Sequence, residues 1–154
     1  MKTAKLLVIF CFIFGISVNS YSQDEIDLLI LNRKFKEALL KIDEFGQQSH
    51  TAKLLYKKGL ILSNLQNYRD AVKVYSDALQ LEPGNPEILS ELAETYSTLG
   101  NYHDANRYFK KAISLQTGNL ILKAKLGRNC ILLKDYKCAY NCFSELYKSD
   151  STNV

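Results

Sequence analysis

Three cysteines near the end of this 154-residue sequence, Cys130, Cys138 and Cys142, are the side chains best suited to chemistry. A fourth, Cys11, lies in the leading segment, so the three that remain allow at most one internal bridge. Cys130 can pair with either Cys138 or Cys142, provided that the two Cα atoms lie within about 7 Å. Buried free thiols, which are common in proteins, are the second interpretation. A zinc site is the third, although the spacing is not Cys-x-x-Cys and no histidine is near in sequence.

The remaining titratable residues do not form a catalytic pattern. His50 and His103 occupy an expected loop and an expected helix start, where we expect solvated side chains. Glu91 and Glu94 lie three residues apart on an expected helix, which is an ordinary surface arrangement. The sequence has no glycine-rich phosphate loop and no metalloprotease or serine-hydrolase motif. It therefore predicts a protein that is not an enzyme and has no catalytic residue, cofactor, resident metal or small-molecule substrate.

Composition and charge indicate a globular protein with no nucleic-acid partner. Apolar residues make up 47% of the chain and charged residues 23%, which is the range of a folded domain. The formal net charge of +4 comes from 20 basic and 16 acidic residues. This balance is too even to indicate a nucleic-acid-binding face.

The first 22 residues have the pattern of a secretory signal peptide. A basic start, MKTAK, precedes an apolar run at residues 6–18, and Ser20 and Ser22 are small residues before Gln23, the expected mature start. As a helix the apolar run would span about 20 Å, short of a hydrocarbon core of about 30 Å, which disfavours the alternative of an uncleaved membrane anchor. We expect an exported protein, periplasmic if the source is a bacterium and otherwise secreted.

A longer pattern positions these residues, because one stretch of sequence returns every 34 residues. LQNYRDAVKVYSDALQLEPGNP at 65–86 has counterparts at 99–120 and 133–154. Tyrosine recurs at 68, 102 and 136, alanine at 71, 105 and 139, and an aromatic residue at 75, 109 and 143. A fixed period of this size indicates an array of structural repeats.

Each repeat is expected to form two helices. In the second helix of the first repeat, residues 68, 71, 75 and 78 fall three or four apart and define one apolar face. Gly59 on the first helix is expected to face Ala71, so that the two backbones approach closely. Gly84 can end the unit in the left-handed conformation. The residues expected to cap the second helices are Asn67, Asn101 and Asp135.

This helix–turn–helix unit, with small, aromatic and alanine positions in this order, resembles the tetratricopeptide repeat. The resemblance covers units 52–85, 86–119 and 120–153. It implies an all-α solenoid of helical hairpins wound as a right-handed superhelix. The third unit departs from the family pattern at Lys123 and Leu146, which indicates looser packing at that end.

A degenerate helix pair at residues 23–51 is expected to precede the three units. Phe35 and Ala38 lie 33 residues before Tyr68 and Ala71, so the second helix of the pair keeps almost the same phase. Its partner would be a short helix that begins close to the predicted cleavage site.

The resemblance implies that the first helices of the units line a concave groove, which binds a peptide or an extended segment of another protein. The implied lining residues are Lys53, Tyr56, Leu60, Asn64, Glu87, Ser90, Glu94, Thr98, Ile121, Ala124, Arg128 and Ile131. This surface is mixed, unlike the lysine and asparagine set with which some members hold a chaperone's C-terminal carboxylate. The alternative is that these side chains only keep the face soluble.

The last helix of the third unit is expected to leave one face uncovered. Tyr140 and Tyr147 correspond to Val72 and Leu79, which should pack against the following unit. We expect this face to dock on a partner or on a second copy, unless the tyrosine hydroxyls make it tolerant of water.

The sequence thus predicts a non-enzymatic protein–protein interaction module of the cell envelope or secretory space. Two alternatives stay open at this point. One is an exported thiol/disulfide or metal-binding protein that uses Cys130, Cys138 and Cys142. The other is a structural subunit that assembles through its last helix.

Overall fold

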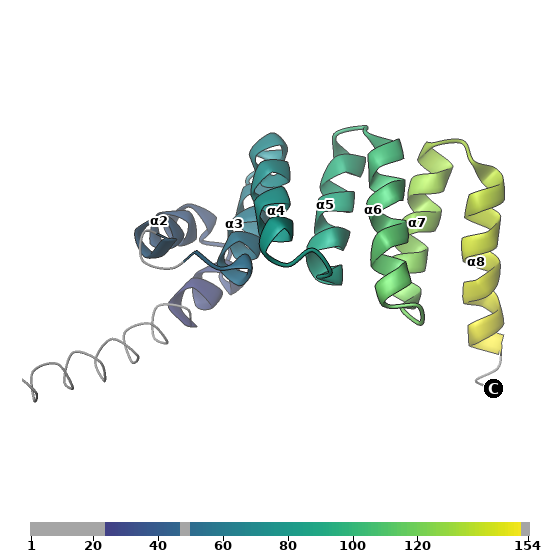
Figure 1. Cartoon of the computed structure of the whole chain (residues 1–154), viewed down its shortest axis with the longest axis horizontal. Coiled ribbons are helices and arrows are strands. Elements are labelled where there is room, and N and C mark those ends of the chain that lie inside the picture. Colours follow the sequence, from purple (N-terminus) through teal and green to yellow (C-terminus); the bar gives the residue numbers. More distant parts are fainter. Residues whose placement is uncertain (1–23, 47–49, 152–154) are drawn as a thin grey trace, which may run out of the picture. The chain divides into compact units, whose positions relative to one another are not determined.

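The computed structural model describes residues 24–46 and 50–151, and every regular element in these ranges is an α-helix (Figure 1). The expected signal peptide, residues 1–22, and the expected mature start at Gln23 lie outside the described residues. The chain divides after His50 into two compact units. Among the described helices, none combines the length and the hydropathy needed to cross a membrane.

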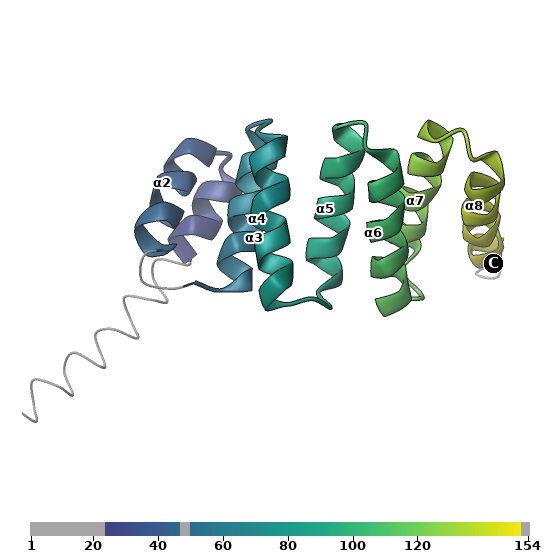
Figure 2. The same ribbon diagram turned by 45° about the horizontal axis from the view of Figure 1, so that its top comes forward.

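The second unit is a row of helical hairpins that follow one another in chain order (Figures 1 and 2). Its helices are α3 (Ala52–Asn64), α4 (Tyr68–Leu81), α5 (Pro86–Thr98), α6 (Tyr102–Leu115), α7 (Leu120–Leu132) and α8 (Tyr136–Ser151). Each hairpin packs on the adjoining one, because α4 contacts α5 and α6 contacts α7. This arrangement confirms the expected all-α array.

The first helices of the hairpins lie on the inner side of the row. Helix α5 contacts α3 and α7, whereas no comparable contact joins α4, α6 and α8 within the described ranges. Because the first helices approach one another and the second helices do not, the row bends toward α3, α5 and α7. These three helices therefore form its concave side.

The turn inside each hairpin closes in the same way. Between α3 and α4, the Asn67 N–H donates to the Leu62 carbonyl at 2.8 Å and the Gln66 N–H donates to the Ser63 carbonyl at 3.0 Å. This pair of bonds is the Schellman motif, which places one residue in the left-handed region. The residues at that position are Arg33 (φ 57°), Gln66 (φ 62°), Gly100 (φ 81°) and Lys134 (φ 59°).

Side chains cap the helices that begin each later hairpin. The Asn85 Oδ1 accepts from the Ile88 N–H, and the Asn119 Oδ1 accepts from the Leu122 N–H, both at 3.1 Å. Pro86 occupies the first turn of α5, where a missing N–H costs nothing.

Two expectations about the helix ends are wrong. Gly84 is not left-handed, because the chain leaves α4 through Glu82 (φ −131°, ψ 77°) and then turns at the Asn85 N–H to Glu82 carbonyl bond. Asn67 and Asn101 make no side-chain capping bond. The Asn67 side chain lies instead beside the Asp70 carboxylate, and the pKa of Asp70 is lowered by Lys73 and, to a lesser extent, by Asn67. Asp135 does cap α8, accepting from the Cys138 N–H at 3.0 Å.

Aromatic rings fill the space between the paired helices. Tyr75 and Phe109 are buried together with the periodic alanines. A Cβ atom on Gly59 would overlap the Tyr75 ring, and one on Gly127 would lie 2.8 Å from the Phe143 ring. Each glycine therefore makes room for an aromatic side chain of the second helix.

The first unit contains a helical segment at residues 24–31 followed by α2 (Phe35–Gly46). The turn between them has the same left-handed position, at Arg33, as the later hairpins. Ile26 is buried in the first helical segment, as are Ala38, Ile42 and Phe45 on α2. An ion pair between Lys41 and Glu25, 3.7 Å apart, joins them at the surface.

Candidate functional site

The residues expected to line a groove lie on α3, α5 and α7, and most of them are accessible to solvent. The exposed ones are Lys53, Asn64, Glu87, Thr98, Ile121, Arg128 and Ile131. The partly buried ones are Tyr56, Leu60, Glu94 and Ala124. Ser90 is different, because only 4% of it is exposed, so its hydroxyl is part of the packing and not of the open surface.

A polar network ties α5 to α7 on this side. The Lys125 ammonium donates to the Ser90 hydroxyl at 3.2 Å, forms an ion pair with Glu94, and lies 3.9 Å from a Glu91 carboxylate oxygen. Burial raises the pKa of Glu91 and the nearby Glu94 raises it further, while Lys125 opposes the shift. One lysine therefore serves two carboxylates, which leaves negative charge on this part of α5.

Two tyrosines continue the network toward α3. The rings of Tyr56 and Tyr75 lie with centroids 6.3 Å apart. Burial raises the pKa of Tyr56, with further contributions from Glu91 and Glu87. Tyr56 thus lies beside the acidic residues of α5.

Tyr75 extends from α4 into the same region. Its ring passes Gly59, and its hydroxyl is buried without a hydrogen-bond partner among the described residues. Burial raises the pKa of Tyr75 well above its usual range. The nearby Ser63 hydroxyl opposes that shift, although its geometry does not make a hydrogen bond.

A cavity of about 220 Å³ opens between α5 and α7. Glu94, Ser97 and Thr98 line it from α5, Phe109 from α6, and Lys125, Arg128, Asn129 and Leu132 from α7. It combines two cations, one carboxylate, hydroxyl groups and apolar side chains. Such a mixture can hold both the main chain and a side chain of a bound segment.

Asn129 fixes one wall of this cavity. Its Nδ2 donates to the Tyr102 carbonyl at 2.9 Å and to the Asn106 Oδ1 at 2.8 Å, so both of its hydrogens are used within the array. Its Oδ1 is buried and has no partner among the described residues. Asn129 therefore holds α7 on α6 and keeps one acceptor unused.

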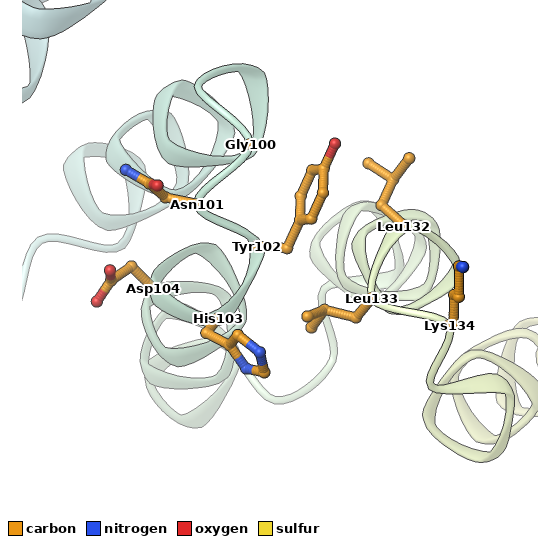
Figure 3. A pocket seen from close by; sticks show the side chains of 8 residues that line it. All are labelled: Gly100, Asn101, Tyr102, His103, Asp104, Leu132, Leu133 and Lys134. Carbon is orange, nitrogen blue, oxygen red and sulfur yellow. The ribbon is translucent and has the colours of Figure 1, made fainter.

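A larger hollow, of about 420 Å³, lies where the α5–α6 turn meets the α7–α8 turn. In Figure 3 the Tyr102 ring points toward Leu132, whereas Asn101 and Asp104 point away from both leucines. His103 is exposed on its rim, and Asp104 pairs with Arg107 at 2.9 Å. The hollow is therefore lined by two leucines together with the side chains of Tyr102, His103 and Lys134.

The cysteines lie together in the last hairpin. The structure contains a disulfide between Cys130 and Cys138, with Cα atoms 5.9 Å apart, and leaves Cys142 as a buried free thiol. Of the two pairings left open by the sequence, it is the one with the shorter separation, 8 residues along the chain. No group of three potential metal ligands lies together in the part of the chain that the structure describes.

The outer face of α8 is open to solvent. Tyr140 is 73% exposed and Tyr147 is 77% exposed. Their counterparts in the first hairpin, Val72 and Leu79, are partly buried beside the next hairpin. The structure therefore places both tyrosines where an adjoining element could cover them.

Sequence reasoning missed Glu91 and Lys125. Both residues stand on helices whose charged positions look like ordinary surface. Their partnership depends on how far α7 approaches α5, which the spacing within either helix does not reveal. A usable signal was present in the period, because Lys125 and Glu91 both occupy the sixth position of their units.

A tetratricopeptide-repeat family model matches residues 65–106. No curated protein sequence matches the chain. Among solved structures, a MamA protein superimposes with a TM-score of 0.79 at 14% identity, over 86% of this chain and 73% of that one. YrrB, described as a TPR protein with an unusual peptide-binding site, gives a TM-score of 0.74 at 15% identity, over 83% of this chain and 66% of that one.

A tetratricopeptide repeat protein from Parabacteroides merdae gives a TM-score of 0.77 at 16% identity, over 86% of this chain and 52% of that one. At these identities the likeness concerns the fold. The family model covers helices α4 and α5, and the solved structures extend the likeness to most of the chain. The chain is therefore an α-helical repeat array with the tetratricopeptide-repeat fold.

Proposed function

We propose that the concave side of the second unit binds an extended segment of another protein and catalyses no reaction. The observation that supports this best is the cavity between α5 and α7, where charged side chains meet the apolar Phe109 and Leu132. The similarity to YrrB adds support, because YrrB is described as having a peptide-binding site on the same fold.

The side chains around the cavity match the groups that a protein segment carries. Arg128 is exposed and can donate to main-chain carbonyls or to a carboxylate. Ile121 and Ile131 are exposed on the same helix and offer apolar contact, and burying a large aliphatic side chain contributes about 1.5–3 kcal/mol. Binding therefore combines a directional polar contact with apolar burial along α7.

Selection from a library of random displayed peptides, with the folded protein as bait, tests this proposal. The substitution Arg128→Ala should raise the Kd of the selected peptides about tenfold, which corresponds to a loss of about 1.4 kcal/mol in binding free energy. The Kd is measured by fluorescence anisotropy. Arg69→Ala is the matched control, because Arg69 is exposed on α4, away from the concave side. No enriched peptide, or equal weakening by both variants, contradicts the proposal.

We propose in addition that the protein is exported, periplasmic in a bacterium and otherwise secreted. The support is the basic start and apolar run of residues 1–22, which have the pattern of a cleaved signal. Protein collected outside the cytoplasm should begin at Gln23 by N-terminal sequencing. If all of the protein stays in the cytoplasm with Met1 or Lys2 at its start, this part of the proposal fails.

We propose self-association through α8 as a second candidate function. The supporting observation is the solvent exposure of Tyr140 and Tyr147, at positions that are partly buried in the first hairpin. Such contact would add copies to one end of the array and leave the concave side free.

A further inference from the structure

We propose that Cys130, Cys138 and Cys142 form a thiol–disulfide exchange centre, in which the bond to Cys130 moves from Cys138 to Cys142. The centre lies within the hairpin of α7 and α8. It is independent of the peptide-binding surface proposed above.

The repeat register places Cys142 against Cys130. These residues lie 34 positions after Tyr108 and Tyr96 respectively. The rings of that tyrosine pair stack across the α5–α6 hairpin with centroids 5.6 Å apart. Because α7 and α8 repeat the same hairpin, the two cysteines occupy facing positions on adjacent helices.

Direct packing in the last hairpin agrees with the register. A Cβ atom on Gly127 would lie 3.2 Å from the Cys142 Cβ, so Cys142 packs on α7 within one turn of Cys130. Cys130 and Cys142 are buried in one apolar cluster, against which Cys138 is also packed. Cys138 and Cys142 are four residues apart on α8 and therefore project from the same face.

The side-chain amide of Asn106 is the polar neighbour of the Cys130 sulfur. The Cys130 Sγ lies 3.5 Å from the side-chain amide of Asn106, which can donate a weak hydrogen bond to sulfur. The bonded sulfur carries no hydrogen and cannot donate in return. Asn106 thus contacts the sulfur that both disulfides share.

The exchange balances without an external oxidant. Cys142 loses its proton to water, and its thiolate attacks the Cys130 sulfur. The Cys130–Cys142 bond forms as the Cys130–Cys138 bond breaks, and the bonding pair leaves on Cys138 as a thiolate, which takes up a proton from water. One disulfide and one thiol are present before and after the step.

The exchange changes which cysteine carries the free thiol, and the two free thiols differ in their access to solvent. Cys142 is buried, whereas Cys138 is partly exposed in the first turn of α8. Exchange therefore converts a sheltered thiol into an accessible one, with no change in the overall oxidation state. The reactive group that the protein offers to an outside reagent is then Cys138.

The test is alkylation of the oxidised native protein with N-ethylmaleimide, followed by digestion and mass spectrometry. We expect the label to accumulate on Cys138 together with a Cys130–Cys142 crosslink. Cys142→Ala is the matched control and should keep Cys138 unlabelled. The proposal is overturned if Cys138 stays unlabelled in the wild type, or if it is labelled equally fast in Cys142→Ala.

A second variant removes the original partner. Cys138→Ser, treated with oxidised glutathione, should form the Cys130–Cys142 bond while circular dichroism shows an unchanged helix content. A folded Cys138→Ser protein that keeps both thiols free under these conditions overturns the proposal. If Cys138→Ser does not fold, the alkylation of the wild type and of Cys142→Ala decides alone.

Discussion

Tyr75 differs from its counterparts Phe109 and Phe143 by one hydroxyl group, and that oxygen has no hydrogen-bond partner among the described residues. An unsatisfied buried polar group costs about 1–3 kcal/mol. We therefore expect Tyr75→Phe to raise the free energy of unfolding by about 1 kcal/mol, measured by urea denaturation. Tyr68→Phe, at a partly exposed position, should change it little. A loss of stability in Tyr75→Phe would mean that Ser63 does bond to the hydroxyl.

Single residues also show where sequence reasoning stopped. The Cys130–Cys138 pairing was one of two open choices, since both partners lie on the same face of α8. Ser90 looked like a groove residue from its position but is buried beneath Lys125. In both cases the outcome depends on distances between helices, which the pattern along one helix does not contain.

At the scale of the helices and their turns, the left-handed residue of each hairpin turn predicts how substitutions there change stability. A non-glycine residue in the left-handed region is strained by about 1–2 kcal/mol. Glycine relieves this strain, but its greater backbone entropy in the unfolded chain cancels about 0.5–1 kcal/mol of the stabilisation. Lys134→Gly should therefore raise the free energy of unfolding by up to about 1 kcal/mol. Gly100→Ala should lower it by about the same amount, although its new Cβ would meet no atom within 4 Å.

Chemical denaturation of both variants measures these effects, with Lys134→Ala as the control for loss of the lysine side chain. If Lys134→Ala stabilises the protein as much as Lys134→Gly, the backbone conformation is not the cause.

Helices were easier to predict than the turns that join them. The apolar positions spaced three and four apart gave α4 and α6 their faces, and Asn85 with Pro86 marks the start of α5. The left-handed position was hidden, because Gln66 and Lys134 are not residues that suggest it. Gly100, at the same place in the period, was the one available signal.

At the scale of the whole molecule, the open face of α8 predicts association between copies. Sedimentation of the wild type in a reducing buffer should show a species larger than the monomer at high concentration. The double variant Tyr140→Ser, Tyr147→Ser should then sediment as a monomer, because two exposed aromatic contacts are lost. Leu81→Ser with Leu115→Ser is the control, since both leucines are exposed on other helices. A wild-type monomer at every concentration removes this candidate function.

The array of hairpins could be predicted from the 34-residue period. Small, aromatic and alanine positions recur in phase, because the two helices of every hairpin pack in the same way. The concave network did not follow, since Lys125 meets Glu91 and Glu94 only when adjoining hairpins are stacked.

In the described helices of the second unit one turn recurs, and the close contacts between hairpins join neighbours in the row, which has a consequence for how such a chain can change in length. Splicing in a second copy of residues 86–119 would keep the α4–α5 and α6–α7 junctions and create one new junction, between α6 and the copied α5, at the repeat positions where α4 meets α5 and α6 meets α7 now. The array can thus be lengthened by whole hairpins, which extends the concave side without changing the existing contacts.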